Sequence, residues 1–250
     1  MTMTTPAAAD RTAGVIVIGN EVLSGKVTDT NSPYLARELR KLGVTLRRIV
    51  TIPDEIDVIA AAVAEFHRDY DLVFTSGGVG PTHDDVTIEG VARGLRRKVI
   101  RHPAIVERIR AYFGDRTNEA RLKMAEVPED TELIVDGKLG FPTFKCENVY
   151  ILPGIPEILE QKFDALRERF AAAPYFLRVV YTSDGEGTIA EHLNATLLAF
   201  PDLLLGSYPK IGDPEYAVKL TLESKDRDYV ERALAHLLKL LGDDAVVRTE

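Results

Sequence analysis

The sequence predicts an α/β fold of three layers, α/β/α, with a doubly wound and mostly parallel sheet, followed by a second, smaller α+β domain. Two observations carry this prediction. From Gly14 onward, short β-branched runs alternate with helical stretches. The run 15–18 is continuously apolar, as expected for a strand covered on both faces. Strands and helices in regular alternation imply parallel strands joined by right-handed crossovers.

The first third of the chain contains three strands and two helices. Ser32-Pro33 begins a helix, because Ser caps well and Pro is tolerated at the first helical position. Gly43 ends that helix, since glycine readily adopts the left-handed conformation that follows a last helical turn. Asp54 is placed to cap the next helix. The expected elements are strands at 15–18, 44–52 and 72–74 and helices at 32–42 and 54–68.

The middle of the chain continues the alternation. Helices are expected at 87–95, 103–113, 117–125 and 156–170, and strands at 99–100, 133–135, 141–146 and 149–152. The last two strands form a hairpin-like pair about Glu147-Asn148.

A junction at 171–174 separates a smaller second part. Its order of elements is β-α-β-β-α-β, which closes as an antiparallel or mixed sheet backed by helices. The predicted organisation is therefore a disordered tail over 1–12, the large α/β domain over 13–172 and the small α+β domain over 173–250.

Composition excludes several classes of protein. Among 250 residues, Lys and Arg number 31 and Asp and Glu 39, a net charge of −8 that argues against general nucleic-acid binding. One cysteine permits no intrachain disulfide and no two-cysteine metal motif. The chain shows neither a membrane-length apolar run nor a secretory signal. We expect a cytoplasmic homodimer with neither a membrane nor a nucleic-acid partner.

Three of the predicted strands end in turns rich in glycine or proline. These turns begin at Gly19, at Thr75 and at Pro153. The carboxyl ends of parallel strands share one edge of a sheet, and ligands bind in the crevice at that edge. The sequence therefore predicts that the three turns converge on a ligand site.

The richest of these turns is TSGGVGPTHDDVT, residues 75–87. Glycines let backbone N–H groups approach an anion closely, and the following helix begins with a positive dipole. Two adjacent carboxylates suit a divalent cation that is shared with substrate phosphates. The alternative is a plain turn whose aspartates cap a helix. The candidate residues here are Asp84 and Asp85 as catalytic and metal-binding groups, and Ser76, Gly77, Gly78, Gly80, Thr82 and Thr87 as substrate-binding groups.

Residues after the first strand add further candidates. Glu21 is either a third metal ligand or a solvated turn residue, and Gly19 is a candidate for substrate binding. Asn31 either caps a helix or presents its amide to a base or a pterin ring. The run Gly19 to Lys26 is not a P-loop, because five residues instead of four separate its glycines and Val27 follows the lysine.

Four motifs in combination resemble a known superfamily. They are GNEVLSGKVTDTN (19–31), TSGGVGPTHDDVT (75–87), NEARLKMAEVP (118–128) and LPGIPEIL (152–159). The chain resembles the MoaB/Mog molybdopterin-binding domains, above all the N-terminal domain of CinA and the corresponding domain of animal FAD synthase. Residues 206–224 resemble the FAD synthase version. The resemblance implies a MogA-like fold, a KH-like second domain, and binding roles for Pro153 and Gly154.

The resemblance also implies two alternative functions. The first is a metal-dependent pyrophosphatase that cleaves ADP-ribose or FAD to AMP and a monophosphate. Its expected cofactors are a divalent cation, Mg²⁺ or Co²⁺, and potassium. The second is a non-catalytic molybdopterin- or nucleotide-binding protein of molybdenum cofactor biosynthesis. The chain ends before the amidase domain of CinA and the adenylyltransferase domain of FAD synthase, so neither of those activities is expected.

Overall fold

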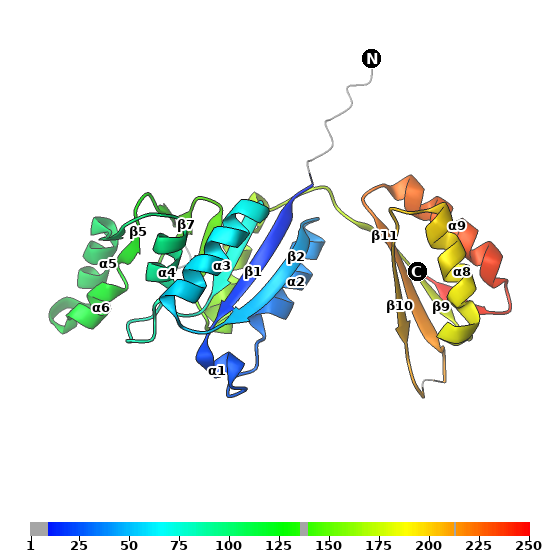
Figure 1. Cartoon of the computed structure of the whole chain (residues 1–250), viewed down its shortest axis with the longest axis horizontal. Coiled ribbons are helices and arrows are strands. Elements are labelled where there is room, and N and C mark those ends of the chain that lie inside the picture. The colour runs from blue at the N-terminus through cyan, green and yellow to red at the C-terminus, as the bar shows by residue number, and fades with distance from the viewer. Residues whose placement is uncertain (1–9, 136–139, 213) are drawn as a thin grey trace, which may run out of the picture. The chain divides into compact units, whose positions relative to one another are not determined.

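The computed structural model describes residues 10–135, 140–212 and 214–250. By their internal contacts these residues divide into two compact units, with the boundary between Ala173 and Pro174 (Figure 1). Of the tail expected over 1–12, residues 1–9 lie outside the described residues. Thr12 is already the first residue of strand β1.

A six-stranded sheet forms the centre of the first unit. Its order is β2-β1-β3-β8-β7-β6. The first four strands are parallel, and β7 runs antiparallel to both of its neighbours. The strands are β1 (Thr12–Ile18), β2 (Thr45–Ile52), β3 (Leu72–Ser76), β6 (Glu132–Ile134), β7 (Thr143–Cys146) and β8 (Val149–Leu152).

Helices cover both faces of this sheet. They are α1 (Asn20–Leu23), α2 (Asn31–Lys41), α3 (Ile56–Asp69), α4 (Thr87–Gly94), α5 (Pro103–Phe113), α6 (Glu119–Lys123) and α7 (Pro156–Leu166), with short 3₁₀ turns at Gly114–Arg116 and Arg167–Arg169. Helices α2 and α7 pack on one face, and α3, α4 and α5 pack on the other. The predicted three-layer, mostly parallel α/β fold is confirmed.

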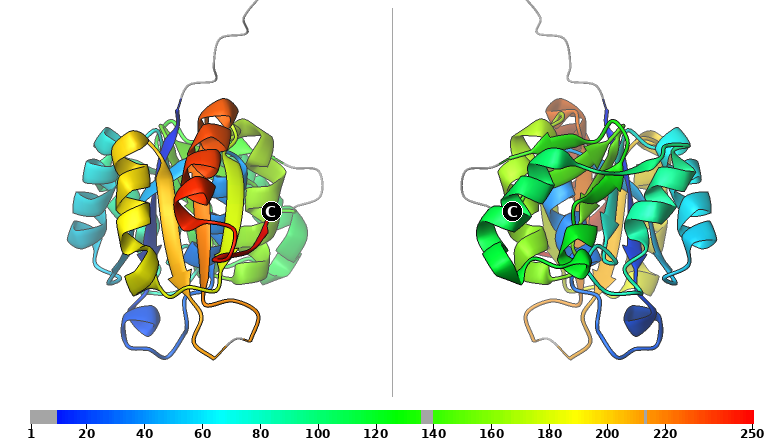
Figure 2. Two further views of the ribbon diagram at one scale, coloured as in Figure 1. Left: turned by 90° about the vertical axis from the view of Figure 1, so that its right-hand side faces the viewer. Right: turned by 90° about the vertical axis from the view of Figure 1, so that its left-hand side faces the viewer.

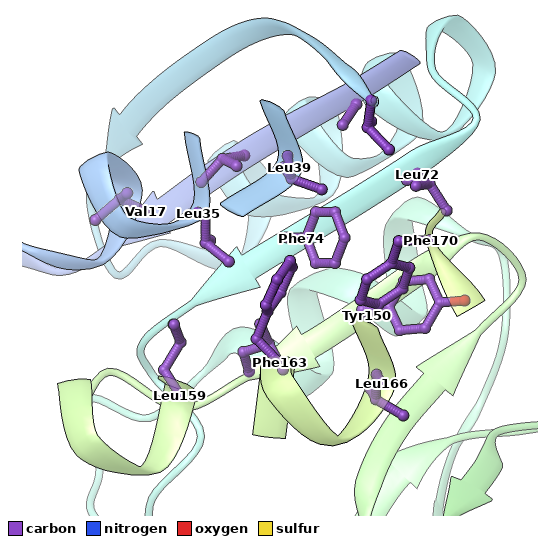
Figure 3. Packing of buried hydrophobic residues seen from close by; sticks show 14 of the residues in the cluster. Val17, Leu35, Leu39, Leu72, Phe74, Tyr150, Leu159, Phe163, Leu166 and Phe170 are labelled. Carbon is purple, nitrogen blue, oxygen red and sulfur yellow. The ribbon is translucent and has the colours of Figure 1, made fainter. Parts of the chain in front are cut away.

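The side chains of β1 show why a continuous apolar run is needed here. Val15 and Val17 join the core under α2 and α7, whereas Ile16 and Ile18 join the core under α3 and α4. Successive residues of a strand point to opposite faces, so a strand between two helical layers must be apolar at every position. On the α2 and α7 side, Phe74 of β3 lies among aromatic rings of β8, α7 and the segment after it (Figure 3).

Three local features differ from the sequence-based expectation. Glu126–Pro128 forms strand β5, which pairs antiparallel with β4 (Val99–Arg101) as a separate two-stranded sheet. Asn20–Leu23 is helical. Asp54 does not cap α3, because its Oδ2 accepts a hydrogen bond of 2.7 Å from the backbone N–H of Asn20. Asp54 therefore ties the turn after β2 to the turn after β1.

The second unit is the smaller α+β domain of the prediction. Its elements are β9 (Phe176–Thr182), α8 (Glu186–Ala199), β10 (Leu204–Pro209), β11 (Val218–Ser224), α9 (Arg227–Leu241) and β12 (Val246–Thr249). The strand order is β10-β11-β9-β12, all antiparallel, and both helices cover one face (Figure 2). This is the split β-α-β arrangement of ferredoxin-like domains.

Within the described residues, no helix is both long and apolar enough to cross a membrane.

Candidate functional site

The strand order places a topological switch point between β1 and β3. The chain leaves β1 for β2 on one side, and β3 pairs with the other side of β1. The turn after β3 lies directly against the ends of both neighbouring strands. A side chain at Gly77 would place its Cβ 2.2 Å from the carbonyl oxygen of Ile18. The N–H of Gly77 donates to the carbonyl of Leu152 at the end of β8, at 3.2 Å. The predicted convergence of the three turns is therefore present.

Asn31 links these turns through its side-chain amide. Its Nδ2 donates to the hydroxyl of Ser76 at 2.9 Å and to the carbonyl of Gly154 at 2.8 Å. Asn31 and Ser76 are both buried. Neither expected role of Asn31, capping or contact with a ring, matches this geometry. The start of α2 is instead stabilised by Asp29, whose Oδ1 accepts from the N–H groups of Asn31 and Ser32.

We expect Asn31→Ala to destabilise the first unit, because it leaves the Ser76 hydroxyl and the Gly154 carbonyl without their donor. Leaving a buried polar group unsatisfied costs about 1–3 kcal/mol. For a unit of this size, each kcal/mol lowers the melting temperature by roughly 2–4 °C. The check is a thermal melt beside Asn20→Ala, a matched control whose side chain is exposed. Equal melting temperatures for the two variants would contradict the bridging role.

The glycine turn is held in an unusual backbone shape. Gly77 and Gly78 have φ values of 106° and 63°, a region that favours glycine. The hydroxyl of Thr87 donates to the carbonyl of Gly77 at 2.9 Å, and its backbone N–H donates to the carbonyl of Gly78 at 3.0 Å. Thr87 is fully buried, and both of these hydrogen bonds shape the turn. Its hydroxyl was expected to bind the substrate, but in the structure it is directed to the carbonyl of Gly77.

Three consecutive backbone N–H groups in this turn have no acceptor. Within the described part of the chain, no atom accepts a hydrogen bond from the N–H of Gly78, Val79 or Gly80. By contrast, the N–H of Gly77 donates to the carbonyl of Leu152, and the N–H of Gly19 donates to the carbonyl of Ile52 at 3.1 Å. Backbone donors normally find a partner, and a concave row of free N–H groups is a binding site for an anion. The part of the turn that offers free donors to an anion is therefore 78–80.

Asp85 is fixed beside these N–H groups. Its Oδ2 accepts from the backbone N–H of Thr82 at 2.8 Å and from the Thr82 hydroxyl at 2.5 Å. A Cβ on Gly80 would lie 2.6 Å from the same oxygen, so the carboxylate lies close to the turn. Thr82 therefore orients Asp85. Lys123 in turn holds Thr82 by donating to its carbonyl at 2.5 Å.

The three expected metal ligands are not gathered in one place. Asp84 is 62% exposed and does not line the cleft, whereas Glu21 and Asp85 do. Among the described residues, no three His, Cys, Asp or Glu side chains form a set that could hold a metal ion. The site that remains has one well-placed carboxylate, Asp85, which fits Mg²⁺ because that ion keeps few protein ligands and shares substrate phosphates.

A cleft of about 840 Å³ opens beside the turn. Its lining includes the glycine turn, Glu21 and Asp85, together with Pro153 and Gly154. The rest of its wall is mostly apolar and aromatic, with two basic side chains. These residues are Arg108, Ile109, Tyr112, Phe113, Met124, Phe141, Pro142, Phe144, Ile151, Ile155, Ile158 and Lys162. The volume lies in the upper part of the usual range of about 300–1,000 Å³ for ligand sites.

Several residues that shape the site carry no local sequence signal. Asp54, Lys123 and Lys162 act through partners far away in the chain. The aromatic wall from α5 and from 141–144 follows ordinary helical and strand periodicity, which predicts a core and not a cleft. A buried lysine at an apolar helix position is the one signal that could have drawn attention, since such lysines are rare.

Comparison with known proteins assigns a family to each unit. Residues 14–172 match the family described as "Probable molybdopterin binding domain", and residues 174–250 match "FAD synthase, middle domain". A protein of Archaeoglobus fulgidus is 36% identical over 229 residues, which cover 92% of this chain and 97% of that one. A "Probable FAD synthase" of Caenorhabditis elegans is 34% identical over 264 residues, covering 94% of this chain and 51% of its own length. This chain thus spans about half of that relative.

A solved structure supports the same relationship. The structure of "the protein CinA with unknown function" from Thermoplasma acidophilum aligns with a TM-score of 0.60 at 32% identity. The alignment covers 64% of this chain and 99% of that one.

Fold and site together define a doubly wound α/β protein with a large cleft at the carboxyl ends of the central strands. The chain belongs to the molybdopterin-binding domain family, with CinA-like and FAD synthase relatives, as the four sequence motifs indicated.

Proposed function

We propose that this protein is a metal-dependent hydrolase that cleaves the diphosphate of an ADP-containing dinucleotide, ADP-ribose or FAD, to AMP and a monophosphate. The observation that carries the proposal is the row of free N–H groups at 78–80 beside Asp85, in the lining of a large, mostly apolar cleft. Relatives named as FAD synthases and CinA-like proteins support a ligand of the nucleotide class.

The N–H groups of 78–80 hydrogen-bond the phosphoryl oxygens of the bound diphosphate. Preorganised donors of this kind stabilise the charge that develops as a phosphoanhydride bond breaks. The positive φ values at 77 and 78 and the anchoring by Thr87 hold these donors in place before the substrate arrives. The turn therefore needs little rearrangement on binding.

Asp85 is the residue that holds the divalent cation, and Glu21 is the other acidic side chain that lines the cleft. When bound, such a cation neutralises phosphate charge and lowers the pKa of a water molecule toward about 7 in favourable cases. Thr82 keeps the Asp85 carboxylate oriented by two hydrogen bonds to one oxygen, Oδ2. Among the described residues, Oδ1 accepts no hydrogen bond and is available to the cation.

The apolar part of the cleft suits the non-phosphate end of a dinucleotide. Phe113, Phe141 and Phe144 offer aromatic surface, and flat rings pack well against such surface. A mononucleotide would leave much of an 840 Å³ cleft empty.

The test is to incubate the purified chain with FAD or ADP-ribose and to measure AMP by chromatography. We expect AMP release with Mg²⁺ or Co²⁺ and loss of release after chelation by EDTA. Potassium is added in a separate arm, because the motif resemblance implies its use. Absence of AMP in every metal arm, with both substrates binding, would reject hydrolysis.

The second candidate function is a non-catalytic molybdopterin or nucleotide carrier. It is favoured by the family to which residues 14–172 belong, and by the absence of histidine among the described residues that line the cleft. The same experiment separates the two functions, since a carrier binds a nucleotide without releasing AMP.

A further inference from the structure

Lys162 is a buried cation in the wall of the cleft. It lies on α7, and only 6% of its surface is exposed. Its Nζ donates to the carbonyl oxygens of Phe141 and Pro142, each at 2.9 Å, and lies 3.5 Å from the hydroxyl of Thr143. The three hydrogens of the ammonium group thus face three acceptors on one short segment.

Among the described residues, no carboxylate forms an ion pair with the ammonium group of Lys162. Burial lowers the pKa of Lys162 to about 8, and no charged neighbour adds to this shift. An apolar side chain of similar volume is often at least as stabilising as a buried charged group. Fold stability alone therefore does not account for a buried lysine here, and the position of Lys162 in the cleft wall indicates a role toward the ligand.

The position of Lys162 connects it to the ligand. Lys162, Phe141 and Pro142 all line the cleft, as does Ile158 one turn earlier on α7. The hydrogen bonds of Lys162 therefore join two parts of the same wall, α7 and the segment 141–143. The other ionised groups that line this cleft are Glu21, Asp85 and Arg108.

We propose that Lys162 is a positioning residue for ligand binding: its ammonium group fixes the segment 141–143 as a wall of the cleft and makes that wall favourable to an anionic ligand. The proposal uses the proposed function only in taking the ligand to be a nucleotide. Loss of the proton leaves an amine that binds the carbonyls more weakly and carries no charge, so ligand affinity falls as the pH rises through about 8.

Stability and affinity then change in opposite directions. The folded-state pKa is below the unfolded value of 10.5, so between about pH 8 and 10.5 the unfolded chain binds more protons at this residue. Lys162 therefore adds stability as the pH rises through this window, while the affinity for an anionic ligand falls. A lysine with a purely structural role would show the rise in stability with pH but not the fall in ligand affinity.

The experiment compares Lys162→Met and Lys162→Arg with Lys145→Met, a matched control on β7 whose ammonium pairs with Glu132. Dissociation constants for FAD and ADP-ribose are measured without metal from about pH 6.5 to about pH 9.5, where a lysine of this pKa changes charge. We expect wild-type affinity to fall by about tenfold across the window. Lys162→Met starts about tenfold weaker and shows no such change.

Two further variants should behave differently from Lys162→Met. Lys162→Arg, which stays charged throughout, recovers affinity and loses the pH dependence. Lys145→Met behaves as wild type. The proposal is overturned if Lys162→Met binds with wild-type affinity and the wild-type pH profile.

A second arm needs no ligand. In ¹⁵N spectra of the wild type, the amide resonances of Phe141 and Thr143 should shift with an apparent pKa near 8, and this shift should be absent in Lys162→Met. A wild type without that transition overturns the proposal even if no variant folds. If neither nucleotide binds the wild type, the proposed function fails, while the resonances still decide whether Lys162 positions the wall.

Discussion

Asp85→Asn should reduce metal-dependent AMP release by at least roughly a hundredfold, a barrier increase of about 2.7 kcal/mol. The substitution keeps the shape of the side chain and an oxygen that can accept from Thr82, but it removes the negative charge that holds the cation. Folding should survive, because a weakened hydrogen bond of this kind costs only about 1 kcal/mol. Initial rates at several Mg²⁺ concentrations, together with a melt, measure both effects.

Asp84→Asn is the matched control for this experiment. It removes the same charge one residue earlier, from a side chain that is 62% exposed and outside the cleft. We expect its activity to stay close to wild type. If Asp84→Asn is as inactive as Asp85→Asn, both aspartates act in the reaction, and assigning the cation to Asp85 alone is wrong. Full activity of soluble Asp85→Asn would remove Asp85 as a ligand.

Gly78→Ala should abolish nucleotide binding at a modest cost in stability. The added Cβ would lie 2.3 Å from the hydroxyl oxygen of Thr87, the group that anchors the carbonyl of Gly77. Relieving this clash moves the turn and its free N–H groups away from the phosphates. The left-handed backbone adds strain of about 1–3 kcal/mol. Titration with ADP-ribose should show a loss of at least about a hundredfold, or roughly 2.7 kcal/mol.

Gly25→Ala is the control that separates the effect of left-handed backbone strain from the effect of the contact between the added Cβ and Thr87. Gly25 also has a positive φ, 72°, but a Cβ there meets no atom within 4 Å. Its variant should lose a similar amount of stability and keep its affinity. Equal affinities for the two variants would mean that the phosphates bind elsewhere.

The fold was predictable because it depends on local patterns that repeat. The apolar run of β1 and the spacing of Leu35 and Leu39 on α2 reveal a buried strand and a one-sided helix without knowledge of their neighbours. Strand β5 was missed because Glu126–Pro128 is short and carries a proline, which local propensity assigns to a turn. Its pairing with β4 is a tertiary effect.

The candidate site was predicted in its location but not in the roles of its residues. The rule that strand ends converge was enough to bring Gly77 beside Gly154. No local pattern could show that Asn31 hydrogen-bonds to Ser76 and Gly154, which lie 45 and 123 positions later in the chain. Nor could it show that the Thr87 hydroxyl hydrogen-bonds to the glycine turn. Asn31, Ser76 and Thr87 were predicted to bind the ligand, and in the structure their buried side chains make hydrogen bonds within the turns. Sequence spacing likewise placed Asp84 and Asp85 together, although neighbouring side chains in a loop point in different directions.

The most direct test is a crystal structure of the wild-type protein with Mg²⁺ and a methylene-bridged analogue of ADP-ribose, whose P–C–P linkage cannot be hydrolysed. We expect the phosphoryl oxygens to accept hydrogen bonds from the N–H groups of Gly78, Val79 and Gly80. We also expect a divalent cation on the Asp85 carboxylate. Phosphoryl groups bound away from residues 78–80, with these N–H groups still facing solvent, would contradict the proposed site.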